Sequence, residues 1–93
     1  MTIMVTGLVP GGNAEMDKQI MEGIGVSPGN TPAGALLRMA GPAEGGYRVI
    51  TAWESQEAWE TFRQERLEPF FVSAGRPVPS FEVSALDSFM VPR

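Results

Sequence analysis

The chain has 93 residues, of which 43% are hydrophobic, a formal net charge of −4 and a pI of about 4.6. This length and composition are typical of one small globular domain, which we expect to span residues 1–93. The acidic balance argues against a nucleic-acid partner and against anionic membranes, and no apolar run approaches the roughly 20 residues of a membrane span. The N-terminus lacks the charged leader of a signal peptide, so we expect a cytoplasmic protein.

The chain contains neither histidine nor cysteine. Disulfides and metal sites built from imidazole or thiolate ligands are therefore excluded, and no phosphate-binding, dinucleotide-binding or nucleophile motif is present. A domain of this length buries only about 60–65% of its unfolded surface, so its own core is thin. We expect the additional stability to come from a homodimer.

The first part of the chain predicts a strand, a helix and a loop. Residues 2–9 are rich in β-forming residues and end at a Pro-Gly-Gly breaker. Asn13 is a suitable N-cap for a helix that ends at Gly23 and Gly25. The segment 25–34 contains two prolines and three glycines, which predicts a loop.

The rest of the chain predicts two paired strands, a helix and a last strand. Residues 35–40 and 47–54 are expected strands, joined by the hairpin connection "GPAEGG". Ser55 is a suitable N-cap for a helix that runs to about Glu68, and Pro69 ends or kinks it because proline has no backbone N–H. The remaining expected segments are a further helical turn (70–75), a fourth strand (80–87) and a tail (88–93).

This order, βαββαβ, predicts a ferredoxin-like α+β fold, a four-stranded antiparallel sheet with both helices on one face. The other face would carry Arg48, Ile50, Ala52 and Glu54 together with residues of the first strand. In an isolated monomer it would expose an apolar patch of roughly a few hundred Å², which is rare. A second copy is the expected cover, which gives a two-fold homodimer.

The segment "AGPAEGGYRVITAWESQEAWETFRQERLEP" resembles the dimeric α/β-barrel superfamily, and in particular its small antibiotic-biosynthesis-monooxygenase-like proteins. The matching motifs are "GPAEGGYRV" between the second and third strands, "WES-x-EAW-x-x-F" leading into the second helix, and "ERLEP" at its end. The resemblance covers residues 34–75, and the flanks match by element order. It implies a dimeric α/β barrel with the helices outside and one pocket per protomer between helices and sheet.

The superfamily includes cofactor-independent oxygenases of aromatic polyketides, cyclases, isomerases and haem-binding enzymes. Many relatives have a histidine where this chain has Arg38. Because this chain has no histidine, haem-dependent and imidazole-base mechanisms are disfavoured, and we expect no cofactor.

The face on which Arg38 lies depends on the register of the hairpin. The favoured register pairs Ala40 with Tyr47. It places Arg38 opposite Val49, in agreement with the resemblance, which puts position 38 in the pocket. A shift of one residue would move Arg38 to the other face. The residues then expected to face the helices are Leu36, Arg38, Tyr47, Val49, Thr51 and Trp53.

Two arginines fall within the apolar arc of the second helix when its residues are placed at about 100° intervals. Arg63 and Arg66 share this arc with Trp59 and Phe62. A charge that faces a core needs a partner, so these arginines either pair with glutamates and carbonyls or hold an anionic group of a ligand. The same two interpretations apply to Arg38 in mid-strand.

We predict that Arg38, with help from Tyr47 or Arg66, stabilises an oxyanion that forms on the substrate. These three residues are the candidate catalytic group. The acids nearest the sheet, any of which would serve as a general base if burial raised its pKa, are Glu54, Glu82 and Asp87.

The candidate substrate contacts are mostly apolar or aromatic. Trp53 and Trp59 either pack in the core or hold a flat substrate. The complete set of residues predicted to contact the substrate is Leu36, Thr51, Trp53, Trp59, Phe62, Met4 and Thr6.

The favoured hypothesis is a cofactor-independent enzyme of secondary metabolism, a monooxygenase or a cyclase, that acts on a hydrophobic and aromatic or polyketide-like small molecule. The substrate would lose a proton, and its carbanion would meet oxygen or close a ring. The loop 25–34 would serve as a lid. The alternatives are a non-catalytic small-molecule-binding or accessory protein with the same pocket, and a purely structural dimer.

Overall fold

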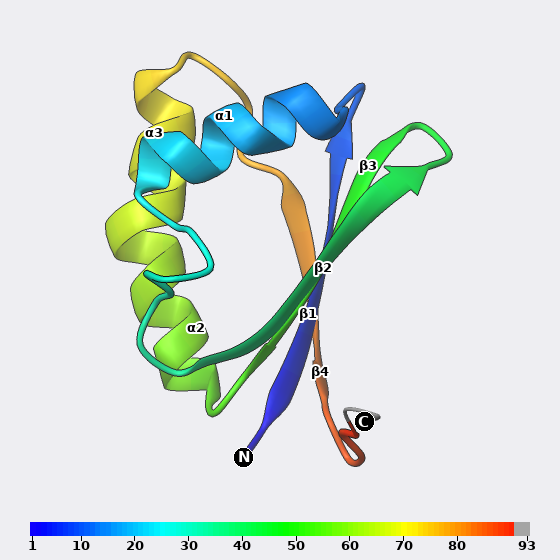
Figure 1. The fold of residues 1–93 in the computed structure, drawn as a ribbon, viewed down its shortest axis with the longest axis vertical. Coiled ribbons are helices and arrows are strands. Elements are labelled where there is room, and N and C mark those ends of the chain that lie inside the picture. Colours follow the sequence, from blue (N-terminus) through cyan, green and yellow to red (C-terminus); the bar gives the residue numbers. More distant parts are fainter. Residues whose placement is uncertain (91–93) are drawn as a thin grey trace.

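The computed structural model describes residues 1–90, and these form a four-stranded antiparallel sheet with helices packed on one face (Figure 1). The strand order is β2-β3-β1-β4, so the predicted ferredoxin-like fold is confirmed. No helix within residues 1–90 is both long and apolar enough to cross a membrane. The elements are β1 (Ile3–Pro10), α1 (Ala14–Ile24), β2 (Ala35–Ala43), β3 (Gly46–Trp53), α2 (Gln56–Phe62), the π-helix η1 (Arg63–Leu67), α3 (Glu68–Ser73) and β4 (Ser80–Ala85).

Helix α1 begins after the predicted N-cap Asn13 and ends at Gly25, whereas Gly23, also expected at its end, lies inside it. The Asn13 side chain accepts a hydrogen bond from the Met16 N–H at 2.8 Å, which satisfies one of the free donors of the first turn. Gly25 closes the helix in the left-handed conformation, with φ of 74°, which glycine adopts without a steric penalty.

The helices α2 and α3 form one continuous helical segment with η1 between them, so the helical turn expected at 70–75 continues the preceding helix and the chain does not end its helix at Pro69. An α-helix would bring the proline ring against the carbonyl four residues earlier. The π-turn widens the backbone just before Pro69, and the Glu68 N–H bonds to the Arg63 carbonyl five residues back. The chain therefore stays helical to Ser73.

The hairpin between β2 and β3 is longer than the sequence indicates. Its strands pair as far as Ala43 and Gly46, so that Glu44 and Gly45 alone connect them. The expected six-residue connection "GPAEGG" is thus mostly strand. Gly45 has φ of 83°, which is the backbone conformation that a turn this tight requires.

The predicted register of this hairpin is wrong by two residues. Ala40 pairs with Val49 instead of Tyr47. Because side chains alternate with a period of two, an even shift leaves Arg38 on the expected face, now opposite Thr51. A β-bulge at Leu36 changes the register near the start of β2.

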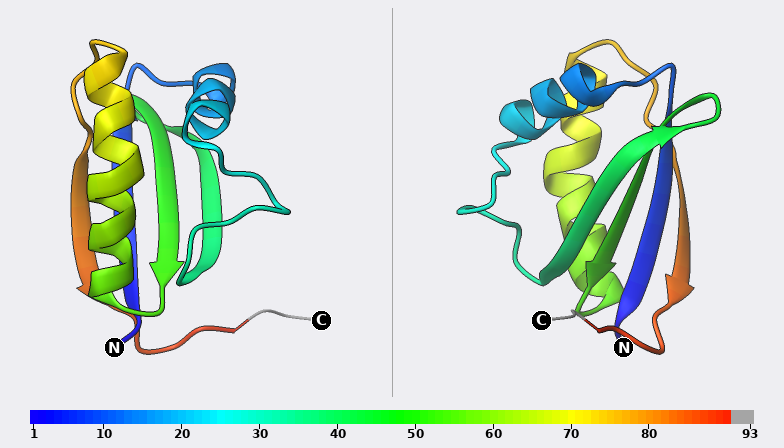
Figure 2. Two further views of the ribbon diagram at one scale, coloured as in Figure 1. Left: turned by 90° about the vertical axis from the view of Figure 1, so that its left-hand side faces the viewer. Right: turned by 45° about the vertical axis from the view of Figure 1, so that its right-hand side comes forward.

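The core lies between the helices and the face of the sheet that β1 and β3 build. The long helical segment runs along β1 and β4, whereas α1 lies toward the other side of the sheet (Figure 2). The buried residues that form the core cluster are Ile3, Val5, Ile20, Ile24, Trp53, Trp59, Leu67 and Phe71.

Helices α1 and α3 approach closely at Gly23. A methyl group added at this glycine would lie 2.0 Å from Cε1 of Phe70, far inside van der Waals contact. The position therefore needs a residue without a side chain, although it lies inside a helix where glycine is unfavourable by about 1 kcal/mol. The contact between the two helices outweighs that cost.

Replacing Gly23 by Ala is expected to lower the free energy of unfolding by about 1–3 kcal/mol, because the Phe70 ring must move out of its site. Gly29→Ala is the matched control, since a methyl group there meets nothing within 4 Å. Urea unfolding of both variants measures the difference. A Gly23→Ala protein as stable as the control would contradict the close helix contact.

Candidate functional site

A cavity of about 800 Å³ lies between the helices and the sheet. Its size falls within the roughly 300–1,000 Å³ of small-molecule sites. Side chains of β1, β3 and α1 line it, together with part of the connection between α1 and β2, including Val26 and Pro32. This connection leaves α1 and returns to β2 on the side of the sheet away from α3 (Figure 2). The loop predicted to act as a lid thus contributes to the wall.

Four aromatic rings join the long helical segment to the sheet beside this cavity. The ring of Trp53 lies 5.2 Å from that of Phe62, and the ring of Trp59 meets Phe81 edge-on at 5.0 Å. Trp53 is only 2% exposed and Trp59 only 3%, so each indole shows little of its face to a ligand. Both tryptophans line the cavity and at the same time belong to the core cluster.

Thr51 places a hydroxyl group in the cavity wall. Its Oγ1 accepts a hydrogen bond from Nε1 of Trp53 at 2.9 Å. A hydroxyl group that accepts one hydrogen bond still has its own proton to donate. Thr51 can therefore act as a donor toward a ligand, held in orientation by the buried indole.

Arg38 and Asp17 form an ion pair in this largely apolar wall. Both residues line the cavity, and the guanidinium of Arg38 donates a hydrogen bond to Oδ1 of Asp17. Their side chains are 31% and 15% exposed. The pair joins β2 to α1, two elements that lie on opposite sides of the cavity.

Asp17 is absent from the residues that the sequence singled out for chemistry. The sequence does contain an indication of its position. Asp17 lies at helical spacing from Ile20, Met21 and Ile24, on the apolar side of α1. An acid on an apolar face needs a partner, as the arginines of the second helix do.

Three solved structures resemble this one. Rv0793 from Mycobacterium tuberculosis has a TM-score of 0.61 and 16% sequence identity, with 94% of this chain and 96% of that chain covered. A mutant of MhuD with two manganese protoporphyrin IX molecules bound per active site has a TM-score of 0.55 and 17% identity, covering 99% and 100%. A mutant of SnoaB, a cofactor-independent oxygenase from Streptomyces nogalater, has a TM-score of 0.57 and 12% identity, covering 96% and 94%.

The chain shares the fold of these three proteins. The resemblance seen in the sequence is thereby confirmed at the level of the fold. No family model matches the chain, and no curated protein matches its sequence.

The residues of this chain do not fit a haem held through an axial histidine. The chain has neither histidine nor cysteine, and Tyr47 does not line the cavity. Within residues 1–90, no group of three or more acids that would hold a metal ion lies together. The polar groups of the wall suit organic oxygen atoms. The guanidinium of Arg38, the ammonium of Lys18 and the hydroxyl group of Thr51 can donate hydrogen bonds, and the carboxylates of Asp17 and Glu22 can accept them.

Six of the predicted site residues line the cavity, and four lie elsewhere. Tyr47 lies beside Val9 and Met16 near the start of α1. Arg66 is exposed, and its Nη2 lies close to Gly25 at the end of α1. Met4 and Thr6 point to the face of the sheet without helices. The six that line the cavity are Leu36, Arg38, Thr51, Trp53, Trp59 and Phe62.

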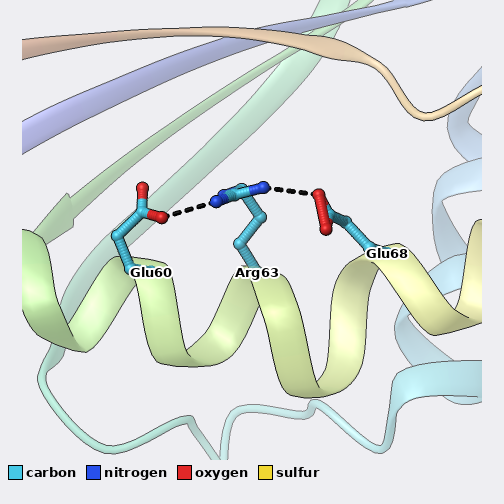
Figure 3. Close-up of polar contacts among 3 residues, drawn as sticks. All are labelled: Glu60, Arg63 and Glu68. Carbon is cyan, nitrogen blue, oxygen red and sulfur yellow. Dashed lines mark hydrogen bonds and ion pairs between the residues drawn. The ribbon is translucent and has the colours of Figure 1, made fainter.

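Arg63 does not line the cavity, although the helical arc places it near Arg66. It pairs instead with Glu60 and Glu68 on its own helical segment (Figure 3). The hydrogen bond to Glu60 raises the pKa of the Arg63 guanidinium above its ordinary value, and the charges of both glutamates act in the same direction. This is the pairing with glutamates that the sequence offered as the alternative to a ligand-binding role.

None of the three acids predicted as a general base lines the cavity. Glu82 pairs with Thr6 and lies on the face without helices, and Glu54 and Asp87 are exposed. The acids in the cavity wall come instead from α1.

Proposed function

We propose that the protein is a cofactor-independent enzyme of secondary metabolism, of the monooxygenase or cyclase type, that acts on a hydrophobic, flat aromatic or polyketide-like molecule. The observation that carries this proposal is an apolar cavity of about 800 Å³ with an arginine–carboxylate pair in its wall. The shared fold with SnoaB, a cofactor-independent oxygenase, supports it.

The apolar wall supports a hydrophobic substrate, because a ligand buried there gains about 25 cal/mol for each Å² of apolar surface removed from water. Arg38 and Thr51 are cross-strand partners, so their donors enter the cavity from neighbouring positions of the sheet. They suit the oxygen atoms of a phenol or a ketone.

The proposed reaction begins when the substrate loses a proton from the carbon next to a carbonyl group. The electron pair of that C–H bond delocalises onto the carbonyl oxygen, and the guanidinium of Arg38 stabilises the oxyanion. The carbanion transfers one electron to dioxygen, and the two radicals join in a C–O bond. Loss of water from the resulting hydroperoxide converts the CH₂ group to C=O. The substrate supplies all the electrons, so the balance is CH₂ + O₂ → C=O + H₂O.

The cyclase version of the proposal uses the same first step without oxygen. The carbanion then attacks a second carbonyl carbon of the same molecule, and a C–C bond closes a ring. Apolar walls would shield the carbanion from water in both versions.

The alternative is a non-catalytic protein that binds the same kind of molecule. It is favoured by the position of Glu54, Glu82 and Asp87, since these candidate bases lie outside the cavity. A binding protein would need Arg38 and Thr51 for recognition alone.

We also propose a homodimer built on the sheet face without helices. This face carries Met39, which is 51% exposed, and the half-buried Met4, Leu8 and Ile50. Apolar side chains on a face that no helix covers favour pairing with a second copy.

Replacing Arg38 by Ala is expected to lower kcat by about 100- to 1,000-fold, the usual effect of removing one oxyanion donor. Stability should change by no more than about 1 kcal/mol, because the ion pair with Asp17 is partly exposed. Oxygen consumption and product analysis with flat aromatic ketones measure the activity. Arg76→Ala is the control, since Arg76 is outside the cavity wall. Equal activity of the two variants would remove Arg38 from the mechanism.

Replacing Ile50 by Asp is expected to convert a dimer into monomers, because the substitution places a charge in the proposed interface. Light scattering after size-exclusion should give twice the chain mass of 10.0 kDa for the wild type and a single chain mass for the variant. Val72→Asp, on the exposed side of α3, should stay dimeric. A monomeric wild type at micromolar concentration would refute this interface.

A further inference from the structure

Asp17 is the acid that the cavity encloses most. Of the acids in residues 1–90, Asp17 and Glu22 line the cavity, and both belong to α1. Glu22 is exposed, whereas the Asp17 side chain is only 15% exposed. Asp17 is therefore the carboxylate that a bound ligand would meet within the wall.

The two oxygen atoms of Asp17 have different surroundings. Oδ1 accepts the hydrogen bond from Arg38. Oδ2 accepts no hydrogen bond from any group of residues 1–90. One oxygen is thus held in place, and the other is able to accept a proton from a ligand.

We propose that Asp17 is the general base of the reaction, which rests on the proposed function of the cavity. Oδ2 takes the proton from the carbon next to the ligand carbonyl, and the electron pair of the C–H bond stays on the ligand as an enolate. Asp17 becomes neutral in this step. Arg38 then pairs with the enolate oxygen in place of the carboxylate.

The charge balance of the cavity favours this assignment. Before proton transfer the Arg38–Asp17 pair consists of one guanidinium and one carboxylate, and afterwards the same guanidinium faces one enolate. Arg38 is therefore paired with a single negative charge throughout, and the step adds no charge beside it. A base distant from Arg38 would leave the carboxylate and the enolate to compete for one guanidinium.

The assignment defines the substrate class by its chemistry. The ligand must carry a C–H bond acidified by a neighbouring carbonyl group, on a flat apolar skeleton. A ligand that already carries a carboxylate would compete with Asp17 for Arg38 and would bind less well than its neutral ketone analogue.

The test measures deuterium exchange at the CH₂ group next to the carbonyl of 1-indanone, a flat aromatic ketone, in D₂O without oxygen and after subtraction of the uncatalysed rate. Asp17→Asn should slow the exchange by about 100-fold or more, the usual contribution of a general base, while tryptophan fluorescence reports unchanged binding. Asp17→Glu, which restores the carboxylate, should recover part of the rate. Glu15→Gln removes a charge from the same helical turn outside the cavity and should exchange like the wild type.

The outcomes separate the two proposals. If the Asp17→Asn protein catalysed deuterium exchange as fast as an active wild type, the role of Asp17 would be overturned. The proposed enzyme would still stand. A wild type that binds 1-indanone but catalyses no exchange would overturn the proposed enzyme, and the role of Asp17 with it. If Asp17→Asn lost both binding and exchange, and Asp17→Glu recovered neither, Asp17 would have a structural role. This result would also overturn the inference.

Discussion

The packing of the long helical segment onto the sheet through aromatic rings is the contact on which the rest of the structure depends. Trp59 and Phe62 come from the helix, and Trp53 and Phe81 come from the sheet. Because these large rings are rigid and the two tryptophans are almost fully buried, they fix the distance between helix and sheet along β1 and β4. Helix α1 lies toward the other side, where no comparable cluster fills the space. The cavity is the volume that remains there.

Two polar groups of the cavity wall are held by partners. Arg38 is paired with Asp17, and the hydroxyl group of Thr51 is oriented by the indole of Trp53. The Arg38–Asp17 pair is partly exposed, and its interaction with a ligand oxygen strengthens where the bound ligand displaces water from the wall. A site of this kind recognises the position of one or two ligand oxygen atoms, and the apolar wall selects for the rest of the skeleton. The Arg38–Asp17 pair also suits the proposed transfer of one proton from the ligand to Asp17.

The sequence predicts the elements of the fold because their signals are local. Alternation of side chains marks the strands, and Asn13 and Ser55 mark the starts of the helices. The hairpin register is not a local property, and the predicted one is wrong by two residues, although an even shift leaves Arg38 on the predicted face. The continuation of the helix through Pro69 depends on a π-turn, and the amino-acid composition of this segment does not indicate one. The pairing of Arg38 with Asp17 joins residues far apart in the chain, so six of ten predicted site residues line the cavity while this carboxylate was missed.

The account depends on a cavity that stays open for a flat apolar ligand beside Arg38. A side chain that filled this space would remove the basis for binding and for catalysis alike. A crystal structure of the protein soaked with a flat aromatic ketone tests this most directly. The account predicts electron density for the ligand between helices and sheet, with its carbonyl oxygen within hydrogen-bond distance of the Arg38 guanidinium. A cavity closed by the protein's own side chains, or a ligand bound elsewhere with its oxygen away from Arg38, would contradict it.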